Sequence, residues 1–335
     1  MRALSLISGG LDSILAAKLI KDQGIEVIGI FFIMPFHVRK KKGKTSALEY
    51  ARSLSAAIGI ELKEISIDDE FFRMVLHPDH GYGKNMNPCI DCRMVMLRKA
   101  KELMGVYGAS FIITGEVLGQ RPMSQHRGQM HKSESQAGLN GLIVRPLSGK
   151  LLGATIPETN GWIKREQLLG FSGRERRPQI DLAVMSGITD FPYPAGGCLL
   201  TDVEFCRRLT EFLDHGGKFS PNEVALLKLG KVFRLADNAR LVVGRDEEEN
   251  ELIAGLAHEG DYLFMPPEDV AGPTCLGRGS FTPELLQMAA RICCSHCRLE
   301  GRDAIEVTCR RAADGAAQAL VASPLEAQEL LKHKV

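Results

Sequence analysis

The feature that most limits the fold lies near the N-terminus, where residues 8–13 have the sequence Ser-Gly-Gly-Leu-Asp-Ser. An apolar run at residues 3–7 precedes them, and apolar side chains with helical spacing follow at residues 14–20. This order predicts a strand, a tight turn and a helix. The backbone amides of such a turn and the positive end of the helix dipole attract an anion, and glycines let a phosphate approach the main chain. The stretch therefore predicts an anion site.

The side chains of this turn add polar groups to the site. Ser8 and Ser13 bring hydroxyl donors, and Asp12 can orient an amide or reach a magnesium ion. No lysine follows the glycines, so the turn is not the Gly-x-x-x-x-Gly-Lys nucleotide loop. An ordinary strand-to-helix turn with Asp12 or Ser13 as helix cap is the simpler interpretation. The full string, however, resembles the PP-loop of ATP pyrophosphatases, which split ATP between its α and β phosphates. The resemblance implies that Ser8, Gly9, Gly10, Asp12 and Ser13 bind ATP with Mg²⁺ and that Asp12 takes part in catalysis.

Length and composition restrict the class of protein. A chain of 335 residues predicts two domains, and 44% hydrophobic with 25% charged residues is typical of soluble globular proteins. The longest apolar stretch, residues 27–36, is far shorter than the roughly 20 residues that cross a bilayer. A glycine-rich turn interrupts the N-terminus, which is unlike a signal peptide. We therefore expect a cytoplasmic protein with no membrane partner. The net charge of +1 does not by itself indicate a nucleic-acid partner.

Strand and helix patterns alternate through the first third of the chain. Strands are expected at residues 25–33, 60–67 and 109–114, with helices at 46–58 and 69–76. Ser46 and Glu49 have the spacing of a capping box. This alternation predicts an α/β fold with a doubly wound parallel sheet, and the resemblance implies the adenine nucleotide α-hydrolase type. Ligands of such sheets bind beyond the carboxyl ends of the strands, where residues 8–13 lie.

Three cysteines have the setting of functional thiols. Cys89 and Cys92 follow a turn-rich loop at residues 77–88 and begin a helix expected to reach Tyr107. A helix dipole lowers the pKa of a thiol, and this spacing lets both sulfurs face one metal ion or each other. Two cysteines with only a packing role are the alternative. Cys198 follows two prolines and two glycines at residues 192–197, a constrained loop that is costly for a packing residue. Nine cysteines in a cytoplasmic protein favour metal, redox or catalytic thiols over disulfides.

A polar loop follows the expected strand at residues 109–114. Polar side chains after a buried strand favour a functional site at this edge of the sheet. The segment resembles the corresponding Gly-Glu-x-Leu-Gly-Gln segment of tRNA 4-thiouridine synthases. That resemblance implies that Gly115 and Glu116 lie near ATP and that Gln120, Ser124 and Gln125 line the adenylate and uridine pocket.

Two basic segments are candidate phosphate contacts. Lysines and arginines in such runs bind the phosphates of ATP or RNA, although a solvated loop is an equally simple interpretation. We predict RNA contacts for Lys40, Lys41, Lys42, Arg174, Arg176 and Arg177.

The C-terminal part indicates a second, smaller α+β domain. Two strands are expected within residues 231–244 and a helix after residue 245, and the pattern over residues 241–273 resembles the RNA-binding domain NFACT-R. We predict a PP-loop ATP pyrophosphatase domain at residues 1–205, a helical linker at 206–230 and an NFACT-R-like domain at 231–335. Cysteines at 293, 294, 297 and 309 are not predicted to bind zinc, because most lie within an expected helix and lack the spacing of a zinc knuckle.

The PP-loop, Cys89-x-x-Cys92 and the distant Cys198 together resemble tRNA thiolation enzymes, both 2-thiouridylases and cluster-dependent 4-thiouridine synthases. The resemblance implies an ATP-dependent tRNA sulfurtransferase that adenylates a uridine carbonyl, with the three cysteines as catalytic ligands of a 4Fe-4S cluster. Its partners would be tRNA and a sulfide or persulfide donor. A persulfide mechanism through Cys92 and Cys198 needs no iron and remains open. So do the choice between positions 2 and 4 of uracil and the oligomeric state.

The sequence is also compatible with two other functions. One is an amidating or nitrile-forming ligase that acts on a small carboxylate and has a zinc site. The other is an RNA-binding module that has lost catalysis, against which the intact PP-loop string argues. The 4-thiouridine synthases usually carry an N-terminal RNA-binding module, whereas this chain begins directly with the loop, so we expect the C-terminal domain to take that role.

Overall fold

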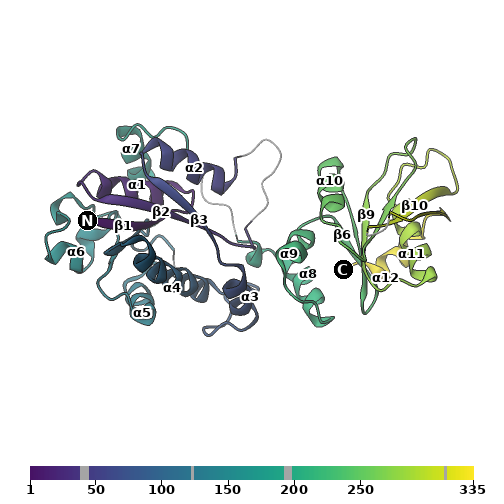
Figure 1. The fold of residues 1–335 in the computed structure, drawn as a ribbon, viewed down its shortest axis with the longest axis horizontal. Coiled ribbons are helices and arrows are strands. Elements are labelled where there is room, and N and C mark those ends of the chain that lie inside the picture. Colours follow the sequence, from purple (N-terminus) through teal and green to yellow (C-terminus); the bar gives the residue numbers. More distant parts are fainter. Residues whose placement is uncertain (38–44, 122–123, 192–197, 313–314) are drawn as a thin grey trace. The chain divides into compact units, whose positions relative to one another are not determined.

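The computed structural model describes residues 1–37, 45–121, 124–191, 198–312 and 315–335. The chain forms two compact units, Met1–Thr201 and Asp202–Val335, each with its own sheet (Figure 1).

In the described residues, the first unit contains a five-stranded sheet with the order β3-β2-β1-β4-β5. Every neighbouring pair is parallel. The chain runs outward from β1 through β2 to β3 and then returns to β4 on the other side of β1, so the winding reverses beside β1. The predicted doubly wound α/β fold is confirmed. The strands are β1 (Arg2–Leu6), β2 (Glu26–Ile33), β3 (Glu61–Ser66), β4 (Phe111–Thr114) and β5 (Ile143–Val144).

Helices cover both faces of this sheet. Figure 1 shows α1 (Leu11–Lys21), α2 (Ala47–Ala57) and α7 (Arg177–Met185) on one side of the strands. On the other side lie α3 (Asp68–Leu76), α4 (Cys89–Tyr107) and α5 (Arg127–Ala137). Strand β2 is buried from residue 27 to residue 32, as its continuous apolar run predicts.

Local sequence rules explain some boundaries and fail at others. The Ser46 hydroxyl accepts from the Glu49 amide at 3.1 Å, and the Glu49 carboxylate accepts from the Ser46 amide at 2.6 Å, so the capping box that begins α2 is confirmed. Residues 161–170 have the sequence pattern of a short amphipathic helix, but within them only Arg165–Gln167 form a helical turn, of the 3-10 type. Leu169 explains the difference, because its amide donates to Pro146 and its carbonyl accepts from Lys150. The shorter elements are α6 (Ile156–Thr159) and the 3-10 turns Gly149–Leu151 and Leu199–Thr201.

The second unit is the smaller α+β domain that the sequence predicts. Its described residues form a six-stranded antiparallel sheet with the order β11-β10-β8-β9-β7-β6. Strand β7 is buried throughout: Leu241 and Val243 pack with residues of α11, whereas Val242 packs with residues of α9 and α10. The strands are β6 (Lys231–Ala236), β7 (Ala239–Val243), β8 (Tyr262–Met265), β9 (Cys275–Gly279), β10 (Ile305–Arg311) and β11 (Ala317–Ala322); the helices are α8 (Val203–Asp214), α9 (Pro221–Leu227), α10 (Glu247–Gly255), α11 (Pro283–Cys294) and α12 (Ala327–His333).

The segment expected to link the domains, residues 206–230, lies within the second unit, which begins at Asp202. It holds most of α8 and all of α9, and both helices carry acids that pair with arginines of the second sheet. Glu211 binds Arg234 at 2.5 Å, and Glu223 lies 3.1 Å from Arg278. These ion pairs attach the two helices of the segment to the sheet of the second unit.

Among the helices within the described ranges, none combines the length and apolar character that a membrane span requires.

Candidate nucleotide and thiol site

The Ser13 side chain links two residues of the PP-loop, Ser8 and Gly10, by hydrogen bonds. The Ser13 hydroxyl donates to the carbonyl of Gly10 at 2.8 Å and accepts from the Ser8 amide at 3.2 Å. Gly9 has φ +74°, and a Cβ there would lie 2.1 Å from the carbonyl oxygen of Ala47. Only glycine fits this position. No side chain caps the helix at Gly10, so the first amides of α1 are available to a phosphate.

Asp12 lies beside two residues that are distant in sequence. The Gln120 side-chain amide donates to Asp12 Oδ2 at 3.0 Å, and Arg176 Nη2 lies 3.8 Å from Asp12 Oδ1. Asp12 and Gln120 were both predicted nucleotide residues, and they are in contact. Arg176 was predicted to bind RNA, but its guanidinium lies at the PP-loop.

The end of strand β4 packs directly against the start of α1. A Cβ at Gly115 would lie 2.5 Å from the amide nitrogen of Ser13. This close approach needs a glycine and brings the predicted residue Gly115 to the PP-loop.

Glu116 is buried in an ion-pair network. Its Oε2 atom lies 2.8 Å from Arg145 Nε and 2.9 Å from Arg93 Nη2, and it accepts from the Thr114 hydroxyl at 3.1 Å. Arg145 also pairs with Glu134. Burial opposes ionisation of Glu116, but Arg93 and Arg145 outweigh it and hold its pKa below the ordinary value. Glu116 therefore joins β4, α4 and the residues after β5, with its carboxylate directed to arginines.

The three predicted thiols share one neighbourhood. Cys89 and Cys92 lie in the first turn of α4, as predicted. Burial, together with the nearby Cys89 and Cys198 thiols, raises the pKa of Cys92 to about 12, against the opposing charges of Arg93 and Arg121. The pKa of Cys92 is therefore raised, against the expected lowering at a helix N-terminus, and burial is the largest cause.

Backbone pairing holds Cys198 at this edge of the sheet. Cys198 forms an isolated antiparallel bridge with His37, and the Leu199 amide donates to the carbonyl of Phe36 at 3.1 Å. Phe36 and His37 follow β2, so Cys198 is held at the carboxyl end of the sheet. The remainder of its predicted loop, residues 192–197, lies outside the described residues.

The loop before α4 is tied to the residue between the first two cysteines. Asp91 is buried, and its Oδ1 atom lies 2.8 Å from His80 Nδ1, while the His80 amide donates to Asp91 Oδ2 at 3.0 Å. These bonds fix the start of α4. A groove of about 480 Å³ between α3 and α4 has Asp91 in its wall but neither cysteine.

The donor chemistry of the three thiols fits an iron-sulfur cluster. Thiolates are the usual ligands of such clusters. Throughout the described ranges, no group of three or more His, Cys, Asp or Glu side chains is arranged to hold one metal ion. Cys89, Cys92 and Cys198 lie close enough to influence one another and are the residues that would supply thiolates to such a cluster.

The remaining predicted site residues are partly buried, partly exposed and partly outside the described ranges. Gln125 is buried in the polar loop, and Arg174 and Arg177 are exposed at the surface. Lys40, Lys41 and Lys42 lie outside the described residues.

The sequence interpretation missed Arg93 and Arg145, which neutralise Glu116. Both had a usable signal. Arg93 directly follows a cysteine of the predicted site, and Arg145 follows strand β5 at the sheet edge where Glu116 follows β4. In the sequence, an arginine that follows a two-residue strand cannot be distinguished from an arginine in an ordinary loop.

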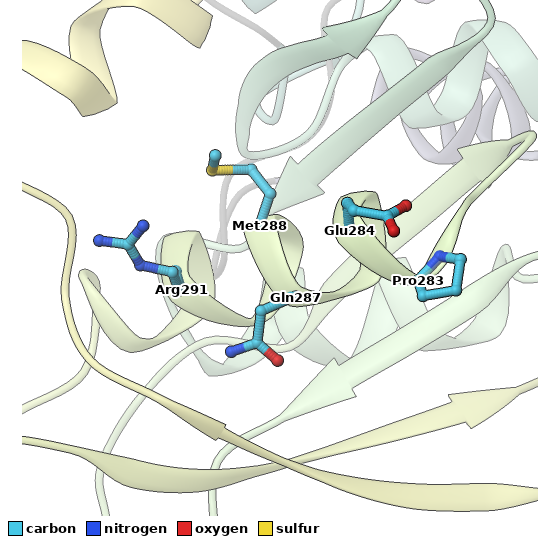
Figure 2. A pocket seen from close by; sticks show the side chains of 5 residues that line it. All are labelled: Pro283, Glu284, Gln287, Met288 and Arg291. Carbon is cyan, nitrogen blue, oxygen red and sulfur yellow. The ribbon is translucent and has the colours of Figure 1, made fainter.

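A hollow of about 440 Å³ lies in the second unit, away from the predicted residues. All its lining side chains come from the start of helix α11 or its body. Figure 2 shows Glu284, Met288 and Arg291 spreading apart along the helix, while Gln287 points to the other side. Gln287 donates to the carbonyl of Val321 at 2.7 Å. These side chains do not converge on a common point, so we assign the hollow no ligand.

The fold and the loop define an ATP pyrophosphatase-like α/β domain followed by a separate α+β domain. Residues 1–151 match the family model described as thiamine biosynthesis protein (ThiI), and residues 230–334 match the NFACT protein RNA binding domain. Residues 1–151 are thus similar to the ThiI family and residues 230–334 to an RNA-binding domain of the NFACT type, which confirms both predicted resemblances.

Curated relatives are similar to the N-terminal part. The tRNA-specific 2-thiouridylase MnmA of Clostridium acetobutylicum is 35% identical over 123 residues, 32% of this chain and 34% of the relative. The enzyme of the same name from Marinobacter nauticus is 31% identical over 141 residues, 38% of this chain and 34% of that one. The chain spans about a third of the length of these relatives.

Two solved structures are more distantly similar. A 4-thiouridine synthetase–RNA complex with bound ATP has a TM-score of 0.38 and 20% identity, over 60% of this chain and 45% of that chain. The U34-tRNA thiolase NcsA from Methanococcus maripaludis, with its [4Fe-4S] cluster, has a TM-score of 0.34 and 14% identity, over 67% of this chain and 70% of that chain.

Proposed function

We propose that this protein is a cytoplasmic, ATP-dependent tRNA sulfurtransferase that adenylates a uridine carbonyl and replaces its oxygen with sulfur. One observation carries the proposal: a PP-loop and three thiols lie at the same sheet edge. Gly115 packs on the PP-loop, and the next residue, Glu116, pairs with Arg93 beside Cys92. The matches to a ThiI-family domain and an RNA-binding domain support tRNA as the acceptor.

The PP-loop would carry the activation step. The uracil carbonyl oxygen attacks the α phosphorus of ATP, the bond to the β phosphate breaks, and pyrophosphate leaves. Amides and hydroxyls of Ser8, Gly9, Gly10 and Ser13 would hold the phosphates, and Asp12 would bind Mg²⁺. Donors and a cation fixed before the reaction stabilise the charge that develops on pyrophosphate. Gln120, which holds Asp12, would line the same pocket.

Cys89, Cys92 and Cys198 would hold the sulfur-bearing group. When bound there, a 4Fe-4S cluster with three thiolate ligands supplies one open Lewis-acidic iron as a place for exogenous sulfide. The incoming sulfur attacks the activated carbon, and AMP leaves with the former carbonyl oxygen. A persulfide route needs two thiols, one to carry the sulfur and one to resolve it, whereas three thiols are present here. This favours the cluster over a persulfide on Cys92.

The second unit would bring tRNA to this site. Its match to an NFACT-type RNA-binding domain supports this role. Lys40, Lys41, Lys42, Arg174 and Arg177 remain proposed contacts for tRNA phosphates, which favour arginine and lysine.

Anaerobic reconstitution tests the thiol site. We expect wild-type protein to bind iron and sulfide and to show a visible charge-transfer spectrum, and Cys89→Ala, Cys92→Ala and Cys198→Ala to lose most of both. Cys206→Ala, a buried cysteine of helix α8, is the matched control and should keep its iron. Wild-type protein without iron, or equal iron in all variants, would contradict the cluster.

Nucleoside analysis tests the reaction. tRNA from a strain without this protein should lack one thiouridine, and mass spectrometry with authentic standards will distinguish position 2 from position 4. Unchanged thionucleosides would exclude tRNA thiolation. Among the described residues, no observation favours the carboxylate ligase with a zinc site.

A further inference from the structure

We propose that Arg176 is a nucleotide-binding residue that contacts the phosphates of ATP beside Asp12 Oδ1, whereas Gln120 binds Asp12 Oδ2. The proposal deepens the proposed function and rests on it, because it names a further residue of the same ATP site. It removes Arg176 from the predicted RNA contacts and separates it from its neighbours Arg174 and Arg177.

The segment before Arg176 is fixed to the sheet edge. The Ser148 hydroxyl donates to the carbonyl of Phe171 at 2.7 Å and accepts from the Leu118 amide at 3.0 Å. The Gly173 amide then donates to the carbonyl of Leu118 at 2.7 Å. A single serine thus joins this segment to the polar loop that carries Gln120. These bonds deliver Arg176 to the PP-loop in a defined position.

Arg176 and its neighbours differ in burial. The Arg176 side chain is 26% exposed, whereas that of Arg177 is 82% exposed and lies 4.0 Å from Asp181 on its own helix. Arg174 is also exposed. Arg174 and Arg177 have the surface positions of RNA contacts, but Arg176 turns inward.

Each of three neighbouring residues has one buried polar atom without a hydrogen-bond partner among the described residues: Asp12 Oδ1, Gln120 Oε1 and Arg176 Nε. Arg176 and Asp12 attract each other, but 3.8 Å is too long for a hydrogen bond. Buried polar atoms in proteins are nearly always paired, so three unpaired atoms from three separate segments indicate a ligand.

The chemistry of these atoms specifies the ligand. Two side-chain oxygens, from Asp12 and Gln120, suit a hard divalent cation such as Mg²⁺. A guanidinium suits an anion, and its planar donors match phosphate oxygens. A cation and a phosphate side by side are the two parts of magnesium-bound ATP. The PP-loop amides lie next to them, so Arg176 would add a positive charge on the pyrophosphate that leaves.

Equilibrium binding to the full-length protein tests the assignment. The probes are α,β-methylene ATP with Mg²⁺, pyrophosphate with Mg²⁺, adenosine and unmodified tRNA. For Arg176→Gln we expect at least about tenfold weaker binding of the two phosphate probes, the loss of one charge-assisted contact. Adenosine and tRNA should bind within about twofold of wild type. Arg177→Gln, the matched control, should keep its affinity for the phosphate probes.

Unchanged affinity of Arg176→Gln for both phosphate probes would overturn the proposal, as would a loss confined to tRNA. Arg176→Lys keeps the charge without the planar fork, and we expect it to bind with intermediate affinity; it also serves if the glutamine variant does not fold. These measurements need no turnover. Failure of thiouridine formation would therefore reject the proposed function without deciding the role of Arg176.

Discussion

The carboxylate of Glu116 lies 2.9 Å from the guanidinium of Arg93, the residue that follows Cys92. This ion pair joins the end of strand β4 to the first turn of α4, the helix that carries Cys89 and Cys92. The preceding residue, Gly115, packs on the PP-loop. Two adjacent residues thus connect the part of the site that would activate the substrate with the part that would supply sulfur.

Glu116→Gln should strongly destabilise the first unit. The substitution leaves Arg93 and Arg145 buried with less compensating charge, and breaking a buried ion pair typically costs about 3–5 kcal/mol. Urea unfolding followed by circular dichroism will measure the change. Glu26→Gln, which breaks an exposed pair with Arg2, is the control and should leave the midpoint nearly unchanged. Equal midpoints for the two variants would contradict the structural role of Glu116.

The same substitution should change the pH dependence of stability. The folded-state pKa of Glu116 lies below its ordinary value of 4.5. Its contribution is therefore complete above about pH 4.5 and is lost as the pH falls through the lower, folded-state pKa. The stability difference between wild type and Glu116→Gln should shrink on acidification below pH 4.5. A difference that stays constant down to acid unfolding would show that the Glu116 charge does not contribute.

Gly115→Ala should disturb the PP-loop. The new methyl group would lie 2.5 Å from the Ser13 amide nitrogen, and overpacking of this kind costs about 1–3 kcal/mol. The start of α1 must shift, so affinity for an ATP analogue should fall as well. Gly105→Ala is the control: nothing lies within 4 Å of the added atom, and alanine within α4 should stabilise by about 0.5–1 kcal/mol. Stability and nucleotide affinity equal to wild type in Gly115→Ala would refute the contact.

The second unit should require the helices before residue 231. Burial and the nearby Arg278 lower the pKa of Arg240 to about 10, and Glu223 of helix α9 pairs with both arginines. Loss of Glu223 and Glu211 removes several buried pairs, a cost comparable to the total stability of about 5–15 kcal/mol of a typical domain. A fragment of residues 202–335 should unfold cooperatively on heating. A fragment of residues 231–335 should show no cooperative transition; an equally sharp one would support the expected role of residues 206–230 as a linker.

Local patterns predicted the elements that depend on local physics. The continuous apolar run of β2, the capping box of Ser46 and the helix that begins at Cys89 follow from residues close together in sequence. Helix α5 was not predicted, because it is largely polar and lacks an apolar stripe; its buried positions include Gln129 and Ser133.

The missed features depend on tertiary structure. The contact of Arg176 with Asp12 joins the two ends of the first unit's sequence, and no local pattern distinguishes Arg176 from Arg174 or Arg177. The raised pKa of Cys92 depends on burial and on Cys198, a residue far along the chain. A helix-end rule applied to Cys92 alone therefore gave the wrong direction for its pKa.

The adjacency of Gly115 and Glu116 also predicts how the first unit opens. Opening β4 separates Gly115 from α1 and Glu116 from α4 in a single event. Amide hydrogens in β4 and in the second turns of α1 and α4, which are hydrogen-bonded within these elements, should then exchange with deuterium through one common opening, with one shared free energy of opening. By this criterion the PP-loop region and the start of the helix that carries Cys89 and Cys92 form one cooperative unit. A destabilising substitution in either part should therefore lower the protection of amide hydrogens against exchange in both.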